Sequence, residues 1–321
     1  MRTPEGKEIV YKLVKEIDVV TDNFRPGVMQ RLGLDLEALR KHNPLIITAS
    51  ATGFGELGPL ADRPSFDIIG QGMGGIMSNM GGGPDEPPQT VVGGIADQTG
   101  AMLLALGIVG AIVARDRQGV GQHVDSSLLG SQLALRGAHL VRFMRGRVQT
   151  PSPQRRNPIF AYFLASDGRS LTIGLLDPRW WPGLANTLER PDLIDDPRFV
   201  TQFDRPENRL ELLPELDAAF AKRERDDSLD LLTEASAPCG PVHDYEGATS
   251  DPQALANDYI TTLEHPSLGE VGVVGSPIRM SETPVRPCHT APELGQHTEE
   301  LLLGLGYEWD KIATLKDCEV I

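Results

Sequence analysis

The stretch DLEALRKHNPLIITA, residues 35–49, contains a helix, a stop signal and a strand in immediate succession. Asp35 is a favourable N-cap for the helix that follows it. Pro44 ends that helix, and the apolar run over 45–49 predicts a buried strand. The preceding residues, 4–21, show the same pattern of a helix followed by a short strand. Helices that alternate with apolar strands predict an α/β protein with a parallel sheet.

The composition is that of a globular protein, with 321 residues, 40% of them hydrophobic, and a formal net charge of −15. This length suffices for two cores, and the negative charge disfavours nucleic acid and anionic membranes as partners. Three cysteines without a CxxC pair indicate a reducing compartment. The N-terminus has no apolar signal core, and the apolar run 101–114 is too short to span a bilayer. We expect a cytoplasmic protein without a membrane or nucleic-acid partner. The seven histidines show no metal-binding spacing, so no metal site is predicted.

The composition changes near residue 149, where 149–158 combine three prolines with two arginines in the manner of a linker. Beyond it, Asp167-Gly168 predicts a hairpin with a tight turn of positive φ angles. Charged helices follow. We therefore expect a large domain over 1–148 that is completed by 286–321, and a smaller α+β domain with its return linker over 159–285.

Asp97 lies in the turn GGIADQ, residues 93–98, where the chain enters the apolar run 101–114. One interpretation is that its carboxylate is only a helix N-cap, and the local pattern alone favours this. The other is that it is a nucleophile, since free N–H groups and the helix dipole favour an ionised carboxylate at that position. The same N–H groups could then stabilise an oxyanion.

Two further motifs are ambiguous. The segment GQGMGG, residues 70–75, fits a dinucleotide-binding fingerprint, but no convincing strand precedes it. We therefore expect a glycine-rich helix that packs closely on a neighbour. The segment NFRPG, residues 23–27, with Arg31 one turn later, offers an amide, an aromatic ring and two guanidiniums at a strand end. Such groups suit phosphates and a purine, or they form a solvated turn.

Taken together, several stretches resemble the family III CoA-transferases, the group of L-carnitine CoA-transferase and bile-acid-inducible protein F. The resemblance covers essentially the whole chain. It rests on DVVTDNFRPG (18–27), RPSFD (63–67), GVGQHVD (119–125), DPRF (196–199), PCGPV (238–242) and APELGQHT (291–298). It implies an α/β fold in which a Rossmann-like large domain with a parallel sheet accompanies a smaller α+β domain. It also implies that the N-terminal segment usual in the family is missing from this chain.

The resemblance further implies that Asp97 is the nucleophile of an acyl-CoA:carboxylate CoA-transferase that works through an aspartyl-CoA intermediate. Coenzyme A and acyl-CoA would be substrates, and no cofactor would be bound permanently. The other partners would be a carboxylic acid and a second copy of the chain in an interlocked homodimer. The CoA contacts of the family map onto Asn23, Phe24, Arg25, Arg31 and Phe66.

Two alternatives remain open. The α-methylacyl-CoA racemases share the fold, but they have a histidine where this chain has Phe66, so the acid–base partner of Asp97 would have to be another residue. The chain could also be a truncated, non-catalytic family member that binds acyl-CoA weakly or not at all.

Overall fold

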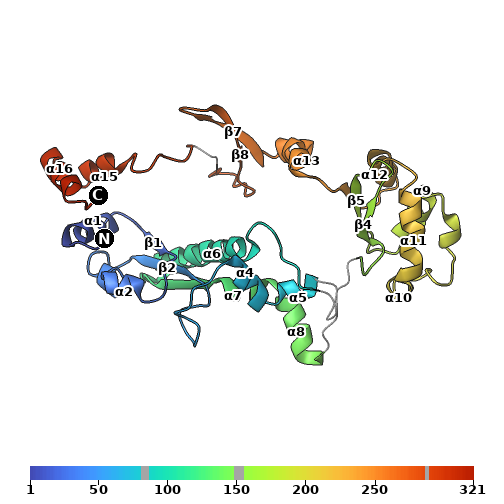
Figure 1. Ribbon diagram of the computed structural model, residues 1–321, viewed down its shortest axis with the longest axis horizontal. Helices are drawn as coiled ribbons and strands as arrows, with labels where there is room; N and C mark the ends of the chain where they lie inside the picture. Colours follow the sequence, from blue (N-terminus) through green and yellow to red (C-terminus); the bar gives the residue numbers. More distant parts are fainter. Residues whose placement is uncertain (81–86, 148–154, 286–288) are drawn as a thin grey trace. The chain divides into compact units, whose positions relative to one another are not determined.

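The computed structural model describes residues 1–80, 87–147, 155–285 and 289–321. The chain divides into two compact units, 1–153 with 293–321, and 154–292, which we describe separately. Figure 1 shows the elements of both units. Of the linker expected over 149–158, residues 149–154 lie outside the described residues. Our domain boundaries at 148 and 285 remain predictions.

The first unit is built on a parallel three-stranded sheet in the order β1 (Val19–Asp22), β2 (Ile47–Thr52), β3 (His123–Ser127). The predicted parallel α/β arrangement is therefore confirmed. Side chains of the central strand alternate between an apolar face and a hydroxyl-bearing face, as the period of two requires. Both faces are buried, as in other parallel sheets. The buried residues are Ile47 and Ala49 on one face and Thr48, Ser50 and Thr52 on the other.

Three helices accompany β1 and β2 in the chain: α1 (Pro4–Val14), α2 (Val28–Leu32) and α3 (Leu36–Arg40). The side chain of Thr3 caps α1 by accepting the N–H of Gly6. Asp35 caps α3, since its Oδ1 accepts the N–H of Ala38 at 2.9 Å. Helices α1 and α3 begin where the sequence predicts them, whereas α2 was not predicted. Apolar side chains of the three helices pack into a common cluster around Val14 and Leu39.

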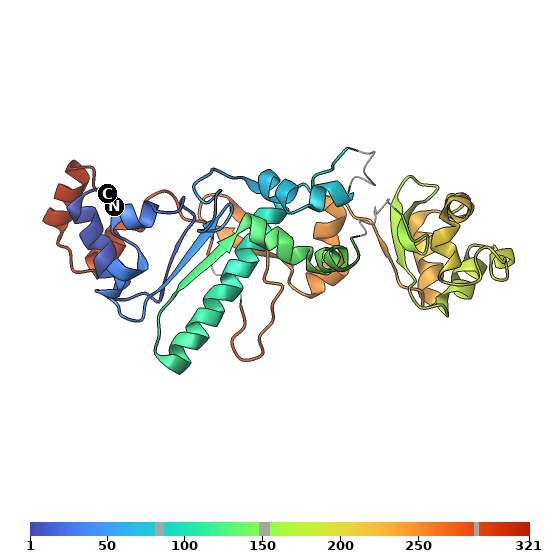
Figure 2. The same ribbon diagram turned by 90° about the horizontal axis from the view of Figure 1, so that it is seen from below.

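The longest helix, α6 (Ile95–Gln118), packs against β2 and β3 (Figure 2). It is long and apolar enough to cross a membrane, but the core helix of a soluble protein can be equally long and apolar. From the sequence we expected the apolar run 101–114 to be too short to span a bilayer. The helix that contains this run has 24 residues, so the argument from length does not hold. Two helices pack on it, α4 (Asp67–Met73) and α7 (Leu128–Leu135); α5 (Ile76–Met80) contacts α4, and α8 (Gly137–Gly146) contacts α7. The helix predicted over 67–80 is thus interrupted, at Gly74 and Gly75.

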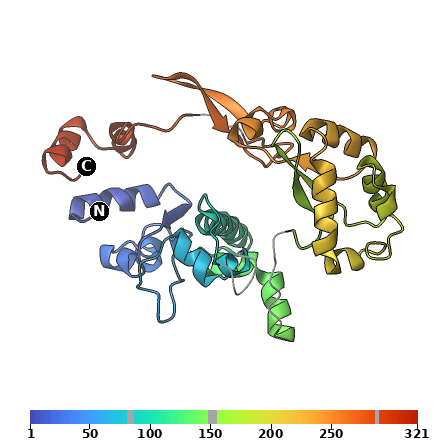
Figure 3. The same ribbon diagram turned by 45° about the vertical axis from the view of Figure 1, so that its right-hand side comes forward.

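The C-terminal helices α15 (Thr298–Gly304) and α16 (Trp309–Asp317) belong to the first unit. Their buried side chains form a cluster with Ile9 of α1. The ammonium group of Lys12, also on α1, lies 3.8 Å from the ring centre of Tyr307. The two ends of the chain are therefore held in one unit (Figure 3).

The second unit contains an antiparallel sheet of β4 (Phe160–Leu164), β5 (Ser170–Gly174) and β6 (Cys239–Pro241). The predicted β4–β5 hairpin is confirmed, but its turn is not the expected type. The N–H of Ala165 donates to the carbonyl of Arg169, and in this loop only Gly168 has a positive φ, of 77°. The helices α11 (Arg209–Phe220) and α12 (Arg225–Glu234) pack on this sheet, and α9 (Trp180–Thr187) packs on α12 within the same hydrophobic core.

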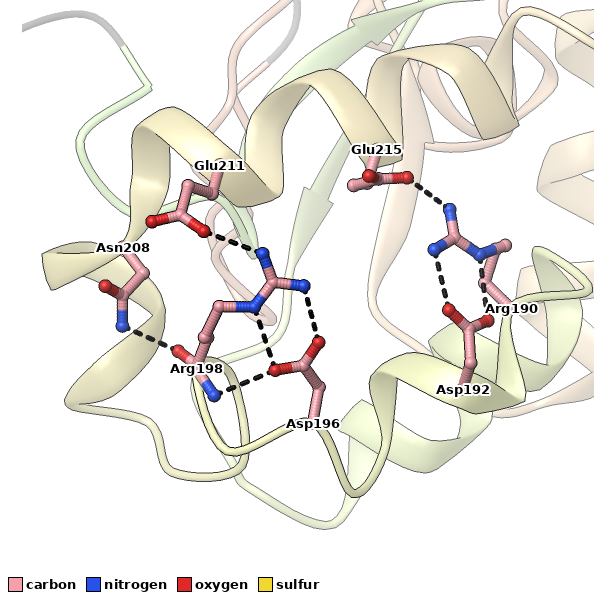
Figure 4. A network of polar contacts seen from close by, with 7 residues as sticks. All are labelled: Arg190, Asp192, Asp196, Arg198, Asn208, Glu211 and Glu215. Atoms are coloured by element: carbon pink, nitrogen blue, oxygen red, sulfur yellow. Dashed lines mark hydrogen bonds and ion pairs between the residues drawn. The ribbon is translucent and has the colours of Figure 1, made fainter.

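Ion pairs fasten the loop between α9 and α11 to the surface of α11 (Figure 4). Arg190 pairs with Asp192 and Glu215, and Arg198 pairs with Asp196 and Glu211. This loop carries the short elements η1 (Pro191–Leu193) and α10 (Asp204–Glu207). The rest of the unit consists of α13 (Tyr245–Ser250), α14 (Pro252–Ala256) and a second hairpin of β7 (Ile260–His265) and β8 (Gly269–Val274).

Candidate active site

Asp97 is the third residue of α6, and the N-cap position belongs to Gly94. Gly94 has a left-handed φ of 74°, which glycine adopts without a steric penalty, and it offers no side chain to cap the helix. The interpretation of Asp97 as the N-cap is therefore wrong. The Asp97 carboxylate does not cap the first turn of α6, and the side chain is exposed at the surface of the unit.

The cap is supplied by a different helix. Oδ1 of Asp67, the first residue of α4, accepts the N–H groups of Ala96 at 2.6 Å and of Asp97 at 3.2 Å. Two of the N–H groups that we expected to be free for an oxyanion are thus already occupied. That part of the expectation is wrong. The Asp67 carboxylate accepts these N–H groups because a negative charge is favoured at the positive end of the helix dipole.

Gln71 lies one turn after Asp67 on α4 and is buried. Its Nε2 donates to Oδ2 of Asp67 at 2.6 Å and to the carbonyl of Val91 at 3.0 Å. Its Oε1 accepts the N–H of Val91 at 2.9 Å. Sequence reasoning missed both side chains. The available signal was an acid and an amide four residues apart, which places them on one face of a helix.

A pocket of about 610 Å³ lies beside Asp97 at the carboxyl ends of the strands. It brings Asp97 together with four of the five predicted CoA contacts: Asn23, Phe24, Arg25 and Phe66. Its walls are formed by residues 23–26 after β1, 51–53 of β2 and its end, 61 and 63–66 before α4, the first turns of α6, and 126–128. Ligands of open α/β sheets bind at this edge.

Arg31 does not line this pocket. It lies exposed on α2, and its guanidinium covers Gly27, at 3.0 Å from where a Cβ atom of that residue would be. The assignment of all five residues as CoA contacts remains a prediction. For Arg31 the geometry supports it less directly than for the other four.

The turn that carries Asn23 and Phe24 is held by Asp22, the last residue of β1. Oδ1 of Asp22 accepts the N–H of Phe24 at 3.0 Å, and its Oδ2 accepts the hydroxyl of Ser50 on β2 at 2.9 Å. One carboxylate therefore fixes the turn and links it to the neighbouring strand. An aspartate at a strand end followed by a turn is the sequence signal for such a bond.

The pKa of Asp97 is raised above its ordinary value. The larger cause is that neighbouring protein atoms displace part of the water around the carboxylate, although the side chain stays exposed, and the second cause is the negative charge of Asp67. The helix start was expected to favour the ionised form, but desolvation and the like charge outweigh it. A carboxylate of raised pKa is a stronger nucleophile once it is ionised.

The glycine-rich segment 70–75 does not form a dinucleotide-binding loop. It lies within α4 and the turn after it, so no strand leads into it. A Cβ atom on Gly70 would lie 3.0 Å from the Cβ atoms of both Ala96 and Leu128. The prediction of a glycine-rich helix that packs closely on its neighbours is confirmed.

Within residues 1–80, 87–147, 155–285 and 289–321, no group of three or more histidine, cysteine, aspartate or glutamate side chains is arranged to hold a metal ion. The structure therefore adds no metal candidate to the site, whose ionisable groups are Asp97, Asp67, Arg25 and Arg63.

The sequence matches the family described as CoA-transferase family III over residues 1–298. The chain belongs to this family. Among solved structures, a CaiB/BaiF family protein from Brucella suis has 31% sequence identity and a TM-score of 0.83, over 95% of this chain and 79% of that one. The expected family III fold is thereby confirmed.

Several curated relatives of this CoA-transferase are also similar along nearly its whole length. The succinyl-CoA–D-citramalate CoA-transferase of Chloroflexus aurantiacus is 34% identical over 330 aligned positions, which cover all of this chain and 81% of the relative. The formyl-CoA:oxalate CoA-transferase of Streptomyces avermitilis is 32% identical, over all of this chain and 82% of the relative. The chain is thus a family III CoA-transferase, which uses CoA thioesters as substrates.

Proposed function

We propose that this CoA-transferase moves CoA from an acyl-CoA donor to a carboxylic acid acceptor through a covalent intermediate on Asp97. The observation that carries the proposal is the position of the Asp97 carboxylate, on the wall of a pocket shared with the turn 23–26 and with Phe66. A nucleophile has to face a space large enough for the thioester, and Asp97 does so.

The proposed reaction has four substitutions. A carboxylate oxygen of Asp97 attacks the thioester carbon of the donor, the C–S bond breaks, and a mixed anhydride and CoA thiolate result. The thiolate attacks the aspartyl carbon of the anhydride and releases the donor acid. The acceptor carboxylate then attacks the aspartyl-CoA thioester and expels CoA thiolate. The thiolate finally attacks the acyl carbon of this second anhydride, which forms the new acyl-CoA and restores the Asp97 carboxylate.

The lining of the pocket suits coenzyme A. Arg25 and Arg63 supply the positive charge that phosphate groups require, although the chain as a whole is acidic. Phe24 and Phe66 are exposed aromatic side chains, 42% and 76% accessible, and they offer faces for the adenine ring or the apolar pantetheine arm. We propose Asn23 as a polar contact in the same turn and Arg31 as a peripheral one.

The names of the relatives suggest which acceptors to test first. They include a succinyl-CoA:mesaconate CoA-transferase of Haloarcula hispanica, 34% identical, and a succinate–glutarate CoA-transferase of Agrobacterium fabrum, 32% identical. Those proteins are named for short dicarboxylic acids. We propose an acceptor of this chemical class and succinyl-CoA as the first donor to assay.

The test is an initial-rate assay with succinyl-CoA and a panel of short dicarboxylates. A covalent intermediate predicts ping-pong kinetics, in which plots at several acceptor concentrations are parallel. Asp97→Asn should abolish turnover. Asp116→Asn, an exposed aspartate near the other end of α6, is the matched control and should retain it. Intersecting plots together with an active Asp97→Asn variant would overturn the proposal.

The racemase alternative has less support at this site. A racemase needs a second acid–base group opposite Asp97, and Phe66 has none. Exchange of deuterium into the α-position of a 2-methylacyl-CoA, in the absence of any acceptor acid, would favour it. A non-catalytic family member is distinguished by binding. If coenzyme A at millimolar concentration does not raise the melting temperature, that alternative gains support.

We propose a homodimer as the working assembly, located in the cytoplasm. The support is the number of large apolar side chains that the first unit leaves exposed on its helices. Met102, Leu106 and Met144 are each more than 60% accessible. Such exposure is unusual for a lone soluble domain and is typical of a surface that another subunit covers. Light scattering of the purified chain should give twice the monomer mass, and a monodisperse monomer would contradict this.

A further inference from the structure

The helix that carries Asp97 begins without a cap of its own. Gly94 occupies the N-cap position in a left-handed conformation and has no side chain. The N–H groups of a first helical turn need acceptors from elsewhere. Whatever supplies them decides where α6 starts, and therefore where the third residue of the helix, Asp97, is held.

Asp67 supplies that acceptor from the start of α4. Its Oδ1 lies 2.6 Å from the nitrogen of Ala96 and 3.2 Å from the nitrogen of Asp97. One of the two bonds thus holds the backbone of the proposed nucleophile itself. Loss of this acceptor would leave both N–H groups unpaired and would free the first turn to shift.

Gln71 fixes both the carboxylate of Asp67 and the segment that leads into α6. It is only 1% accessible, and its amide makes three hydrogen bonds, one to Oδ2 of Asp67 and two to the backbone of Val91. A buried and fully engaged amide has a single favourable orientation. The orientation of the Asp67 carboxylate is fixed as a result.

The part of α4 that carries Asp67 and Gln71 is itself closely packed against its neighbours. Gly70 lies between Asp67 and Gln71 in the sequence, where α4 meets α6 and α7. A Cβ atom at this position would lie 3.0 Å from those of Ala96 and Leu128, which is tighter than ordinary contact. The three helices can approach this closely only because residue 70 is glycine, and α4 cannot slide without disturbing its neighbours.

We propose, on the basis of the function proposed above, that Asp67 and Gln71 are positioning residues that hold the Asp97 carboxylate at the acyl-CoA pocket. Asp67 touches the backbone of Asp97 and does not itself line the pocket. Its role is to hold the nucleophile in reacting geometry, on which transfer rates depend steeply.

The Asp67 carboxylate has two effects that substitutions can separate. As an acceptor it holds the first turn of α6, and as a negative charge it adds to the effect of burial in raising the pKa of Asp97. Asp67→Ala removes both effects. Asp67→Asn keeps an Oδ1 acceptor for the two N–H groups but removes the charge, and it turns an amide N–H group toward Nε2 of Gln71.

The experiment compares the full chain with Asp67→Ala, Asp67→Asn, Gln71→Met and a matched control, Thr3→Ala, which removes the cap of α1 away from the pocket. The readouts are kcat, KM for succinyl-CoA, the melting temperature, and the midpoint of the fall in rate at acid pH. Arg25 and Arg63, the other ionisable groups around the pocket, are unchanged in every variant.

We expect Asp67→Ala and Gln71→Met to lower kcat by about 10- to 100-fold with little change in KM, since a displaced nucleophile reacts slowly while the pocket still binds. Thr3→Ala should lose stability but keep kcat. Asp67→Asn should have a kcat between those of the wild type and Asp67→Ala, because it keeps the acceptor for the two N–H groups but loses the bond from Gln71. Its acid midpoint should move to lower pH, because the pKa of Asp97 falls when the neighbouring charge is removed.

Three results would overturn the proposal. The first is an Asp67→Ala or Gln71→Met enzyme with the kcat of Thr3→Ala. The second is an Asp67→Asn enzyme that is folded but as slow as Asp67→Ala, with an unmoved acid midpoint. If Asp67→Ala does not fold, Asp67→Asn and Gln71→Met decide the matter. The third is a wild-type protein that transfers no CoA, which would overturn the proposed function as well, whereas the first two leave that function standing.

Discussion

Oδ1 of Asp67 lies 3.2 Å from the backbone nitrogen of Asp97. Asp67 therefore caps the first turn of α6, the turn to which Asp97 belongs. The arrangement keeps the Asp97 carboxylate free for the pocket, since a different residue does the capping. It also brings two carboxylates into the same neighbourhood, which raises the pKa of Asp97 beyond the effect of burial. Placement of the nucleophile therefore carries an electrostatic cost.

That cost predicts a gain in stability when the proposed nucleophile is neutralised. The folded-state pKa of Asp97 is raised, so around and above its ordinary value of 3.8 the folded state binds more protons than the unfolded state. Stability is therefore lost as the pH rises through the interval between the ordinary and the raised pKa. Asp97→Asn should lack this loss and melt slightly higher at pH 7, by an amount worth no more than about 0.5 kcal/mol.

Calorimetry at pH 7 and at pH 3 checks the sign. The difference between Asp97→Asn and the wild type should shrink at the lower pH, where both states carry the proton. A variant that melts below the wild type at pH 7 would show that the Asp97 carboxylate stabilises the fold, contrary to our interpretation.

The close contact between α4 and α7 predicts opposite outcomes for two neighbouring glycines. A Cβ atom on Gly74 would lie 2.2 Å from that of Gln132, so Gly74→Ala should destabilise the protein by about 1–3 kcal/mol. A Cβ atom on Gly72 meets only the flexible Met77 side chain, at 3.5 Å. Gly72→Ala should therefore be stabilising, by up to about 1 kcal/mol, through helix propensity. Urea unfolding measures both, and equal effects of the two substitutions would contradict the packing argument.

The lining of the pocket predicts different roles for two arginines of the same motif. Arg25→Ala should raise KM for acyl-CoA by about tenfold or more, because it removes a charge from the pocket wall. Arg31→Ala, outside the lining, should raise KM by less than about threefold, as expected for an exposed charge. Steady-state kinetics with one acyl-CoA decides between them. A larger effect at Arg31 would move the phosphate site toward α2.

In the second unit, a buried arginine should matter more for folding than an exposed one. Arg205 is 1% accessible, stacks 4.4 Å from the ring centre of Trp181, and donates to the carbonyls of Phe199 and Val200. Its burial lowers the pKa of the guanidinium to about 10. Arg205→Met should cost about 2–4 kcal/mol, since the buried carbonyl of Phe199 and the partly buried carbonyl of Val200 lose their donors.

Arg198, in the ion-pair network of Figure 4, is the matched control. Its side chain is 51% accessible, so Arg198→Met should cost much less stability than Arg205→Met even though it breaks two ion pairs. Chemical denaturation of the two variants provides the comparison. Comparable losses would mean that the surface network, and not the buried arginine, stabilises this unit.

Local sequence signals predicted the framework well. The caps at Thr3 and Asp35, the stop at Pro44 and the apolar strand after it depend on neighbours in the chain, and the structure has a helix or strand at each. The helix predicted over 67–80 was less accurate. Its interruption comes at the glycine pair 74–75, where Gly75 has a φ of 81°, a conformation that ends a helix and that the prediction did not include.

The candidate site was predictable in part, for a physical reason. Asp97 and the turn around Phe24 stand at element ends, where turn chemistry is visible in the sequence. The roles of Asp67 and Gln71 depend on a contact between α4 and α6 across some thirty positions of the chain. The four-residue spacing places Asp67 and Gln71 on one face of α4, but no spacing within that helix reveals the contact of Asp67 with α6. For the same reason, the N–H groups of Ala96 and Asp97 were expected to be free although both donate to Asp67.

The most direct test of the central claim is to capture the intermediate. The protein is incubated with succinyl-CoA and then treated with hydroxylamine, which converts an aspartyl anhydride or thioester into a stable hydroxamate, and peptide mass spectrometry locates the modified residue. We predict a hydroxamate on Asp97, and none in Asp97→Asn or in the absence of succinyl-CoA. A hydroxamate on another residue, or CoA transfer that proceeds in Asp97→Ala, would contradict the account.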